Sequence, residues 1–197
     1  MIRVGILGDI GSGKSFVANT FGYPVFNADL EVAKLYNKNS KIYKELRKSI
    51  PKNIFSFPIN KDEILNAILS KKSNLNKITK IVHPEVQKRM KIFLKKNKNK
   101  KIVVLDIPLL MENKINKKND ILVFVDANKN EILKRIKERK NYNKKIINRF
   151  RSLQFTPGYK KKKSKYVIKN NFNKLSVKKY VRDIIRKILD ERNSIRY

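Results

Sequence analysis

Short apolar runs alternate along the chain with longer stretches in which apolar residues recur at helical spacing. The apolar runs with the length and composition of buried strands are residues 2–7, 23–26, 102–107, 121–125 and 166–168. Continuously apolar strands separated by helices are typical of a parallel sheet that is covered on both faces. The pattern therefore predicts an α/β fold with a parallel five-stranded sheet, which binds ligands beyond the carboxyl ends of its strands.

Helical periodicity occupies most of the remaining chain. It predicts helices over residues 14–21, 30–69 with breaks near Pro51 and Pro58, 73–96, 128–139, 143–154 and 175–192. His83-Pro84 is expected to interrupt the third of these, because proline lacks an N–H and clashes with the preceding turn. The lysine run Lys161, Lys162 and Lys163 follows Thr156-Pro157-Gly158 and is predicted to be a solvated loop.

Polar residues stand at several predicted helix starts. Asn60 with Glu63, and Asn128 with Glu131, have the spacing of capping boxes, in which the two side chains bond each other's backbone N–H groups. Ser73 is the predicted cap of the helix that follows.

The composition excludes several kinds of site. Without cysteine the chain has no disulfide, no thiolate metal site and no cysteine nucleophile, and its single histidine excludes a multi-histidine metal site. No apolar stretch approaches the roughly 18 residues that a membrane span needs. Because Met1 leads directly into a predicted strand, we expect a cytoplasmic protein without a signal peptide or membrane partner.

The net charge of +33 has three possible sources. Lysine, asparagine and isoleucine are all specified by A/T-rich codons, so genome composition alone is enough to supply much of the excess. Capture of small anionic substrates and binding to nucleic acid are the alternatives. The lysines are scattered, and aromatic residues do not alternate with them as a base-stacking surface would require. We therefore expect no specific nucleic-acid partner.

Residues 8–15 match the phosphate-binding pattern GxxxxGK[ST] and follow the first predicted strand. Glycines at Gly8, Gly11 and Gly13 allow consecutive backbone N–H groups to turn toward a phosphate. In this pattern Lys14 reaches the β- and γ-phosphates, and the Ser15 hydroxyl binds Mg²⁺. The motif predicts that the chain binds ATP with Mg²⁺ in a P-loop NTPase-type fold.

Further motifs narrow the choice among such proteins. Gly5 to Ser15, taken with Asn27-Ala28-Asp29, His83-Pro84, Pro108 to Glu112 and Gln154, resembles the dephospho-CoA kinase family along essentially the whole chain. The resemblance implies transfer of the γ-phosphoryl group of ATP to the ribose 3′-hydroxyl of dephospho-CoA. It also implies a single three-layer α/β/α domain with a core of residues 1–29, 100–128 and 164–197, a helical acceptor-binding insert over 30–99 and a small helical lid over 129–163.

The resemblance also assigns roles to individual residues. Asp29 is the expected base for the attacking hydroxyl, with a helix N-cap as the alternative role, and Asn27 replaces a family aspartate. Lys14 and Arg139 complete the expected catalytic residues, and Asp106 is a candidate to hold Mg²⁺ through water. The expected ATP contacts are Gly8, Gly11, Ser12, Gly13, Lys14, Ser15, Phe16, Arg135 and Asn170. The expected acceptor contacts are His83, Pro108, Leu109, Leu110, Glu112 and Arg149.

Simpler explanations stay open for several of these residues. The histidine and the leucines can serve packing, and the arginines can belong to a solvated basic helix. Another small P-loop kinase, acting on a nucleoside monophosphate or a metabolite, would share the loop, the arginines and Mg²⁺. A nucleic-acid-binding P-loop ATPase is the alternative of a different class. We expect a monomer, although the sequence does not determine the oligomeric state.

Overall fold

The structure is a computed structural model that describes residues 1–139 and 142–194. The chain divides into two compact units. The sheet unit comprises Met1–Phe26, Asn99–Tyr142 and Arg151–Tyr197, and the helical unit comprises Asn27–Lys98 and Asn143–Phe150. The helical unit therefore consists largely of one long insertion between the second and third strands.

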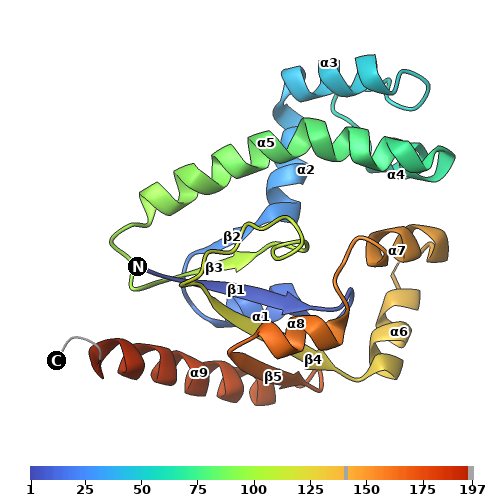
Figure 1. Cartoon of the computed structure of the whole chain (residues 1–197). Coiled ribbons are helices and arrows are strands. Elements are labelled where there is room, and N and C mark those ends of the chain that lie inside the picture. Colours follow the sequence, from blue (N-terminus) through green and yellow to red (C-terminus); the bar gives the residue numbers. More distant parts are fainter. Residues whose placement is uncertain (140–141, 195–197) are drawn as a thin grey trace. The chain divides into compact units, whose positions relative to one another are not determined.

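The sheet unit contains a five-stranded sheet with strand order β2-β3-β1-β4-β5. Its strands are β1 (Ile2–Gly8), β2 (Val25–Asn27), β3 (Ile102–Asp106), β4 (Ile121–Ala127) and β5 (Tyr166–Asn170). Strand β1 pairs in parallel with both β3 and β4, and β4 pairs in parallel with β5 (Figure 1). The predicted parallel sheet is confirmed, and the ends of β1 and β3 lie side by side at its carboxyl edge.

The helices differ from the predicted ones in number and extent. They are α1 (Lys14–Thr20), α2 (Ala28–Lys38), α3 (Ser40–Ser49), α4 (Lys61–Ser70), α5 (Lys72–Lys96), α6 (Lys129–Lys137), α7 (Lys144–Arg151), α8 (Pro157–Lys163) and α9 (Lys174–Ser194). No helix in the described ranges 1–139 and 142–194 is both long and apolar enough to cross a membrane.

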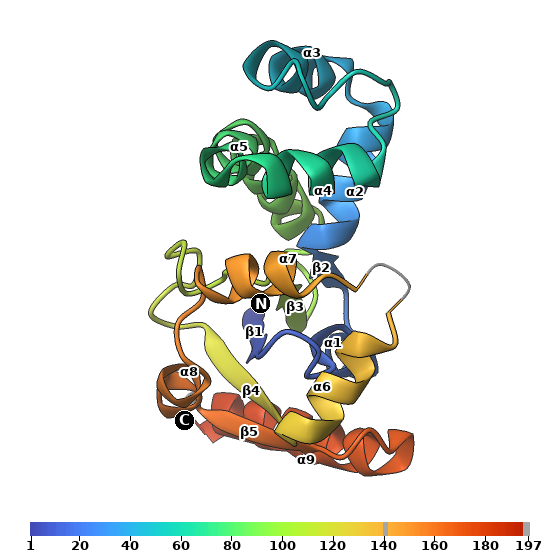
Figure 2. The ribbon, with the colours of Figure 1, turned by 90° about the vertical axis from the view of Figure 1, so that its right-hand side faces the viewer.

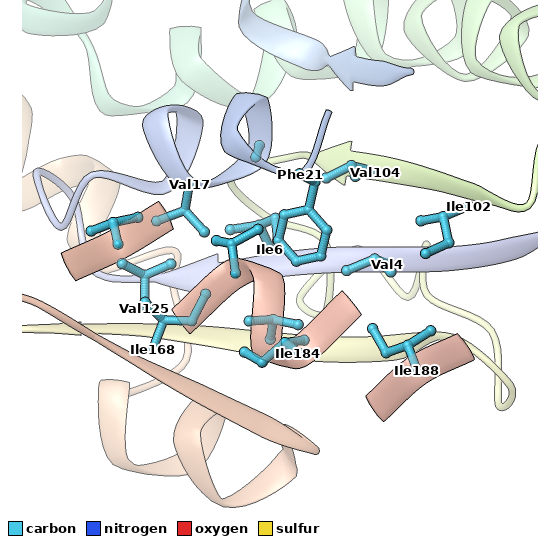
Figure 3. Packing of buried hydrophobic residues seen from close by; sticks show 14 residues of the cluster. Val4, Ile6, Val17, Phe21, Ile102, Val104, Val125, Ile168, Ile184 and Ile188 are labelled. Atoms are coloured by element: carbon cyan, nitrogen blue, oxygen red, sulfur yellow. The ribbon is translucent and has the colours of Figure 1, made fainter. Parts of the chain in front are cut away.

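The core of the sheet unit lies between the sheet and two helices. Alternate residues of β1, Val4 and Ile6, pack with Val17 and Phe21 of α1 and with residues of α9 such as Ile184 (Figure 3). On the other side of the sheet from α1, α8 lies against β1 and β4 (Figure 2). Helices therefore cover both faces, as the predicted three-layer α/β/α fold requires.

The predicted interruption at His83-Pro84 is wrong, because α5 runs unbroken from Lys72 to Lys96 with Pro84 inside it. Buried residues before and after the proline, among them Ile78, Val82 and Val86, hold both halves of the helix in the core of the helical unit. Their burial offsets the roughly 3 kcal/mol that an interior proline costs. Ser73 lies within α5 and is not its cap, since the N-cap position is Lys71.

Two further predictions in the helical unit need correction. Asn39 ends α2 and begins α3 by accepting a hydrogen bond from the Ile42 N–H at 3.0 Å, a break that periodicity did not reveal. Asn60 does cap α4, but Glu63 is no partner in a capping box. Its carboxylate instead accepts hydrogen bonds from the N–H groups of Phe55 and Ser56.

The lysine run is helical and does not form the predicted loop. Thr156 caps α8 by accepting a hydrogen bond from the Tyr159 N–H at 3.3 Å, and Pro157 occupies the first turn, where a missing N–H costs nothing. Three of the lysines, Lys161, Lys162 and Lys163, are exposed, whereas Lys160 is buried.

Candidate active site

The phosphate loop, residues 8–15, joins the carboxyl end of β1 to α1. Gly11 and Gly13 have φ angles of 86° and 91°, in the region that favours glycine. The loop therefore has the backbone shape that the motif predicts. The Ser12 hydroxyl is buried and has no hydrogen-bond partner among the described residues, so this donor can still bond a phosphate oxygen.

The Lys14 side chain folds back onto its own loop. Its Nζ donates to the carbonyl oxygens of Asp9 at 2.7 Å and of Gly8 at 3.3 Å. Ser15 and Phe16 are exposed at the start of α1. Phe16 places an aromatic side chain, 39% exposed, next to Ser15.

Asn170 supports the phosphate loop from β5. It is 4% exposed, and its Nδ2 donates to the Ser12 carbonyl at 2.8 Å, while its Oδ1 accepts from the Phe172 N–H at 2.8 Å. A Cβ at position 13 would clash with Asn170 Nδ2, which is a second reason for glycine there. The expected contact of Asn170 with ATP stays a prediction, and the structure gives this side chain a role in loop support that sequence reasoning missed.

An arginine and an aromatic ring stack beside the loop. The Arg135 guanidinium of α6 lies 4.4 Å from the centre of the Phe172 ring, and Phe172 has a φ of 61°, which is rare for a bulky residue. The stack leaves Arg135 exposed and therefore able to contact a nucleotide. Arg139, two residues beyond α6, is also exposed. Sequence reasoning found both arginines but not Phe172, which no motif distinguishes.

Asp106 ends β3 and is 4% exposed. Because β1 and β3 are parallel neighbours, the Asp106 carboxylate and the phosphate loop lie at the same edge of the sheet. The described residues contain no cluster of three or more acidic or histidine side chains that could enclose a metal. Mg²⁺ usually keeps several waters and binds one or two protein oxygens together with substrate phosphates, so a Ser15 hydroxyl and an Asp106 carboxylate suit it.

The segment after β3 packs inside the sheet unit. Leu110 is fully buried, whereas Pro108 and Leu109 are partly exposed. The Glu112 side chain is 7% exposed, accepts a hydrogen bond from the Phe155 N–H at 2.9 Å, and lies 3.4 Å from Lys160 Nζ. Packing therefore explains Leu110 and internal pairing explains Glu112. Contact of any of these four residues with an acceptor stays a prediction.

The helical unit carries the remaining predicted residues. Asn27 caps α2 by accepting a hydrogen bond from the Leu30 N–H at 2.9 Å, so the alternative role of Asp29 as the cap is wrong. Asp29 is exposed in the first turn of α2. Arg149 of α7 donates to the Leu69 carbonyl at 3.2 Å.

His83 lies half-buried on α5. Burial lowers the pKa of its imidazole below the ordinary 6.5, so the ring is neutral at physiological pH. A neutral imidazole can donate and accept one hydrogen bond each but adds no positive charge for a phosphate.

Comparison with known proteins identifies the family. A model of the dephospho-CoA kinase family matches residues 2–175. Among curated relatives, the dephospho-CoA kinase of Wolbachia sp. subsp. Brugia malayi (strain TRS) is 33% identical over 187 residues, which cover 92% of this chain and 95% of the relative.

Solved structures share the fold of this chain. The crystal structure of TT1252 from Thermus thermophilus has a TM-score of 0.73 at 25% identity and covers 96% of this chain and 97% of that one. Dephospho-CoA kinase from Campylobacter jejuni shares the fold, with a TM-score of 0.63 at 20% identity over 94% of this chain and 96% of that one. Since the family match spans most of the sequence and the relative is matched along nearly its full length, the chain belongs to the dephospho-CoA kinase family.

Proposed function

We propose that this protein transfers the γ-phosphoryl group of ATP to the ribose 3′-hydroxyl of dephospho-CoA, giving coenzyme A and ADP. The main support is the family match over residues 2–175, which includes the whole phosphate loop. In the proposal the reaction is the last step of coenzyme A synthesis, and the protein works as a cytoplasmic monomer.

The sheet unit binds ATP in this proposal. The N–H groups of the phosphate loop and the Ser12 hydroxyl donate to phosphate oxygens, and Lys14 moves from its carbonyl partners to the β- and γ-phosphates. Ser15 binds Mg²⁺ directly and Asp106 binds it through water. The metal ion neutralises charge on the phosphates when bound. Arg135 contacts the nucleotide, Arg139 binds the transferring phosphoryl group, and Arg149 binds the acceptor. Arginine suits these roles because a guanidinium group binds phosphate oxygens with two parallel hydrogen bonds.

Asp29 acts on the acceptor. Its carboxylate accepts the proton of the ribose 3′-hydroxyl as the oxygen attacks the γ-phosphorus and the bond to the β-phosphate oxygen breaks. Asp29 is an exposed residue, and the capping bond of α2 is made by Asn27 and not by Asp29. His83, Pro108, Leu109, Leu110 and Glu112 are proposed to bind or shape the site for dephospho-CoA.

The test is phosphoryl transfer with separate acceptors. The purified chain is incubated with Mg²⁺-ATP and dephospho-CoA, AMP, CMP, uridine or shikimate, and ADP release is measured with product identification. We expect transfer to dephospho-CoA and none above background to the others. Lys14→Ala should abolish the reaction, because it removes the charge placed on the β- and γ-phosphates.

Two results would contradict the proposal. Efficient transfer to AMP, CMP, uridine or shikimate in place of dephospho-CoA would make the chain a different P-loop kinase. Near-normal turnover in Lys14→Ala would mean that the phosphate loop is not the site of the reaction.

A further inference from the structure

Lys160 is the one lysine named among the buried residues of the described chain, with 1% of its surface exposed. Lysine is almost never fully buried unless it is paired, because removing an ammonium group from water is costly. The side chain projects from α8, whose other lysines are exposed. The free-energy cost of desolvating the Lys160 ammonium group must therefore be offset by polar partners around it.

Three oxygen atoms surround the Lys160 ammonium group. Nζ lies 2.8 Å from Gln154 Oε1, 3.4 Å from Glu112 Oε1 and 3.4 Å from the carbonyl oxygen of Gly8. An ammonium group has three N–H donors and no acceptor, so the partners match its donors in number. The third partner belongs to the first residue of the phosphate loop.

The Gly8 carbonyl is shared between two lysines. Lys14 Nζ lies 3.3 Å from the same oxygen. In the proposed reaction Lys14 moves to the phosphates of ATP, and Lys160 then remains as the cationic partner of this carbonyl. A carbonyl oxygen carries partial negative charge and repels a phosphate, whereas the N–H groups of the loop attract it.

We propose that Lys160 is a positioning residue for the phosphate loop: its buried ammonium group holds the Gly8 carbonyl away from the nucleotide so that the loop's N–H groups keep facing the phosphates. This inference rests on the proposed function only in that the loop binds ATP. Gln154 and Glu112 hold the ammonium group in place, and Glu112 is itself anchored by the Phe155 N–H at 2.9 Å.

The experiment must separate positioning from simple stability. Replacing Lys160 alone leaves the Glu112 carboxylate buried without its cation, which is destabilising for any fold. The informative variant is therefore the double substitution Lys160→Met with Glu112→Gln, which removes both charges and keeps an amide oxygen for the Phe155 N–H. Lys162→Met is the matched control, because it removes one exposed positive charge from the same helix.

Two quantities are measured for each variant: the thermal midpoint, and the dissociation constant of a non-hydrolysable Mg²⁺-ATP analogue by calorimetry. We expect the double variant to melt close to the wild type but to bind the analogue about tenfold more weakly, the effect of losing one charge-assisted hydrogen bond. Lys162→Met should match the wild type in both. A double variant that binds the analogue within about twofold of wild type would overturn the inference.

A second comparison decides the question if the double variant does not fold. The chain has no cysteine, so Lys160→Cys, made together with Glu112→Gln so that no carboxylate is left unpaired, introduces a single thiol that can be alkylated in the unfolded chain before refolding. Bromoethylamine restores an ammonium group of nearly the lysine's length, and bromopropane gives an apolar group of the same size. Tighter analogue binding by the ammonium adduct than by the propyl adduct supports the inference, and equal binding refutes it.

Failure of the proposed kinase activity would be distinguishable from failure of the inference about Lys160. A wild-type chain that binds the analogue but does not phosphorylate dephospho-CoA contradicts the proposed acceptor. The comparison of dissociation constants still tests Lys160 in that case, because it does not depend on any acceptor.

Discussion

Asn27 and Asp29 both lie at the start of α2, where Asn27 is the N-cap and Asp29 is the proposed general base. Asn27 supplies the capping bond to the Leu30 N–H, and Asp29 is exposed in the first turn. Because Asn27 makes the capping bond, replacing the Asp29 carboxylate leaves the cap of α2 in place. Catalysis and capping, which are indistinguishable in the sequence, can therefore be tested separately at these two residues.

Asp29→Asn should lower kcat by about 10²–10⁴-fold, the usual contribution of a general base, while KM for each substrate changes little. The thermal midpoint should stay near that of the wild type. Asn27→Ala is the matched comparison, and it should cost about 0.5–2 kcal/mol of stability through loss of the cap. Steady-state kinetics and thermal melts of both variants check this. A full kcat with a lower thermal midpoint in Asp29→Asn would remove Asp29 from the proposed mechanism.

Among individual residues, those of the phosphate loop could be predicted from the sequence, whereas the burial of Lys160 could not. The loop was predictable because eight consecutive residues define its shape and its chemistry. The burial of Lys160 was not, because Gly8 and Glu112 reach it from distant parts of the chain. In the sequence it is one lysine among 49 basic residues. The roles of Asn170 and Phe172 beside Gly13 were hidden for the same reason.

Among the secondary-structure elements, strands were easier to predict than helix boundaries. Each strand was predicted from a short apolar run that overlaps it, although β2 begins two residues after the start of the run 23–26 and β5 extends to Asn170. Pro84 indicated a break from local chemistry, but the packing of α5 within the helical unit outweighs it. Residues 157–163 contain a glycine and a proline, which indicated a loop, although Thr156 and Pro157 also suit a helix start.

Glu63 connects α4 to the segment before it. Its buried carboxylate accepts hydrogen bonds from the N–H groups of Phe55 and Ser56 and from the Ser56 hydroxyl. Burial alone would raise the pKa of this carboxyl, but the three hydrogen bonds outweigh burial and lower the pKa below its ordinary value of 4.5. The charged form is therefore more stable in the folded protein than in the unfolded chain.

Glu63→Gln should lower the free energy of unfolding by about 1–3 kcal/mol near pH 7, because an amide accepts these bonds less strongly than a carboxylate. A depressed folded-state pKa stabilises the fold fully above the unfolded-state pKa of 4.5, and the stabilisation is lost as pH falls through the folded-state value. Urea unfolding of both proteins at several pH values should show the difference shrinking below about pH 4.5. Asp62→Asn, an exposed neighbour in the same turn, is the control for charge at the helix start. A difference that persists unchanged at acid pH would mean that the ionised carboxylate is not what stabilises this segment.

For the whole molecule, the predicted α/β architecture is confirmed. The structure also shows that the chain divides into a sheet unit and a helical unit. Asn27 begins the helical unit, which includes α7 from the distant segment Asn143–Phe150. The family resemblance implies a lid over residues 129–163, which contain α6, α7 and α8, and that lid stays a prediction. Association of α7 with the helical unit depends on contacts such as the Arg149 bond to the Leu69 carbonyl at 3.2 Å.

The net charge of +33 also belongs to this scale. Most lysines in the described ranges 1–139 and 142–194 are exposed. Exposed charges act together as a long-range field that attracts anions and is screened by salt. Dephospho-CoA is an anion through its pyrophosphate, so this field should speed its capture without altering the chemical step.

Added salt should therefore lower kcat/KM for dephospho-CoA moderately and leave kcat nearly unchanged. The screening length falls to about 8 Å at physiological ionic strength, so most of the decrease should occur below about 150 mM salt. Initial rates over a salt series, at limiting and at saturating acceptor, check this, with duplex DNA added as a competitor. Generic attraction predicts that DNA competes at low salt and stops competing near 150 mM, because non-specific binding weakens steeply as counterions are added. A salt-independent kcat/KM would show that the charge plays no part in capture, and strong DNA competition at 150 mM would show a nucleic-acid affinity beyond the generic field.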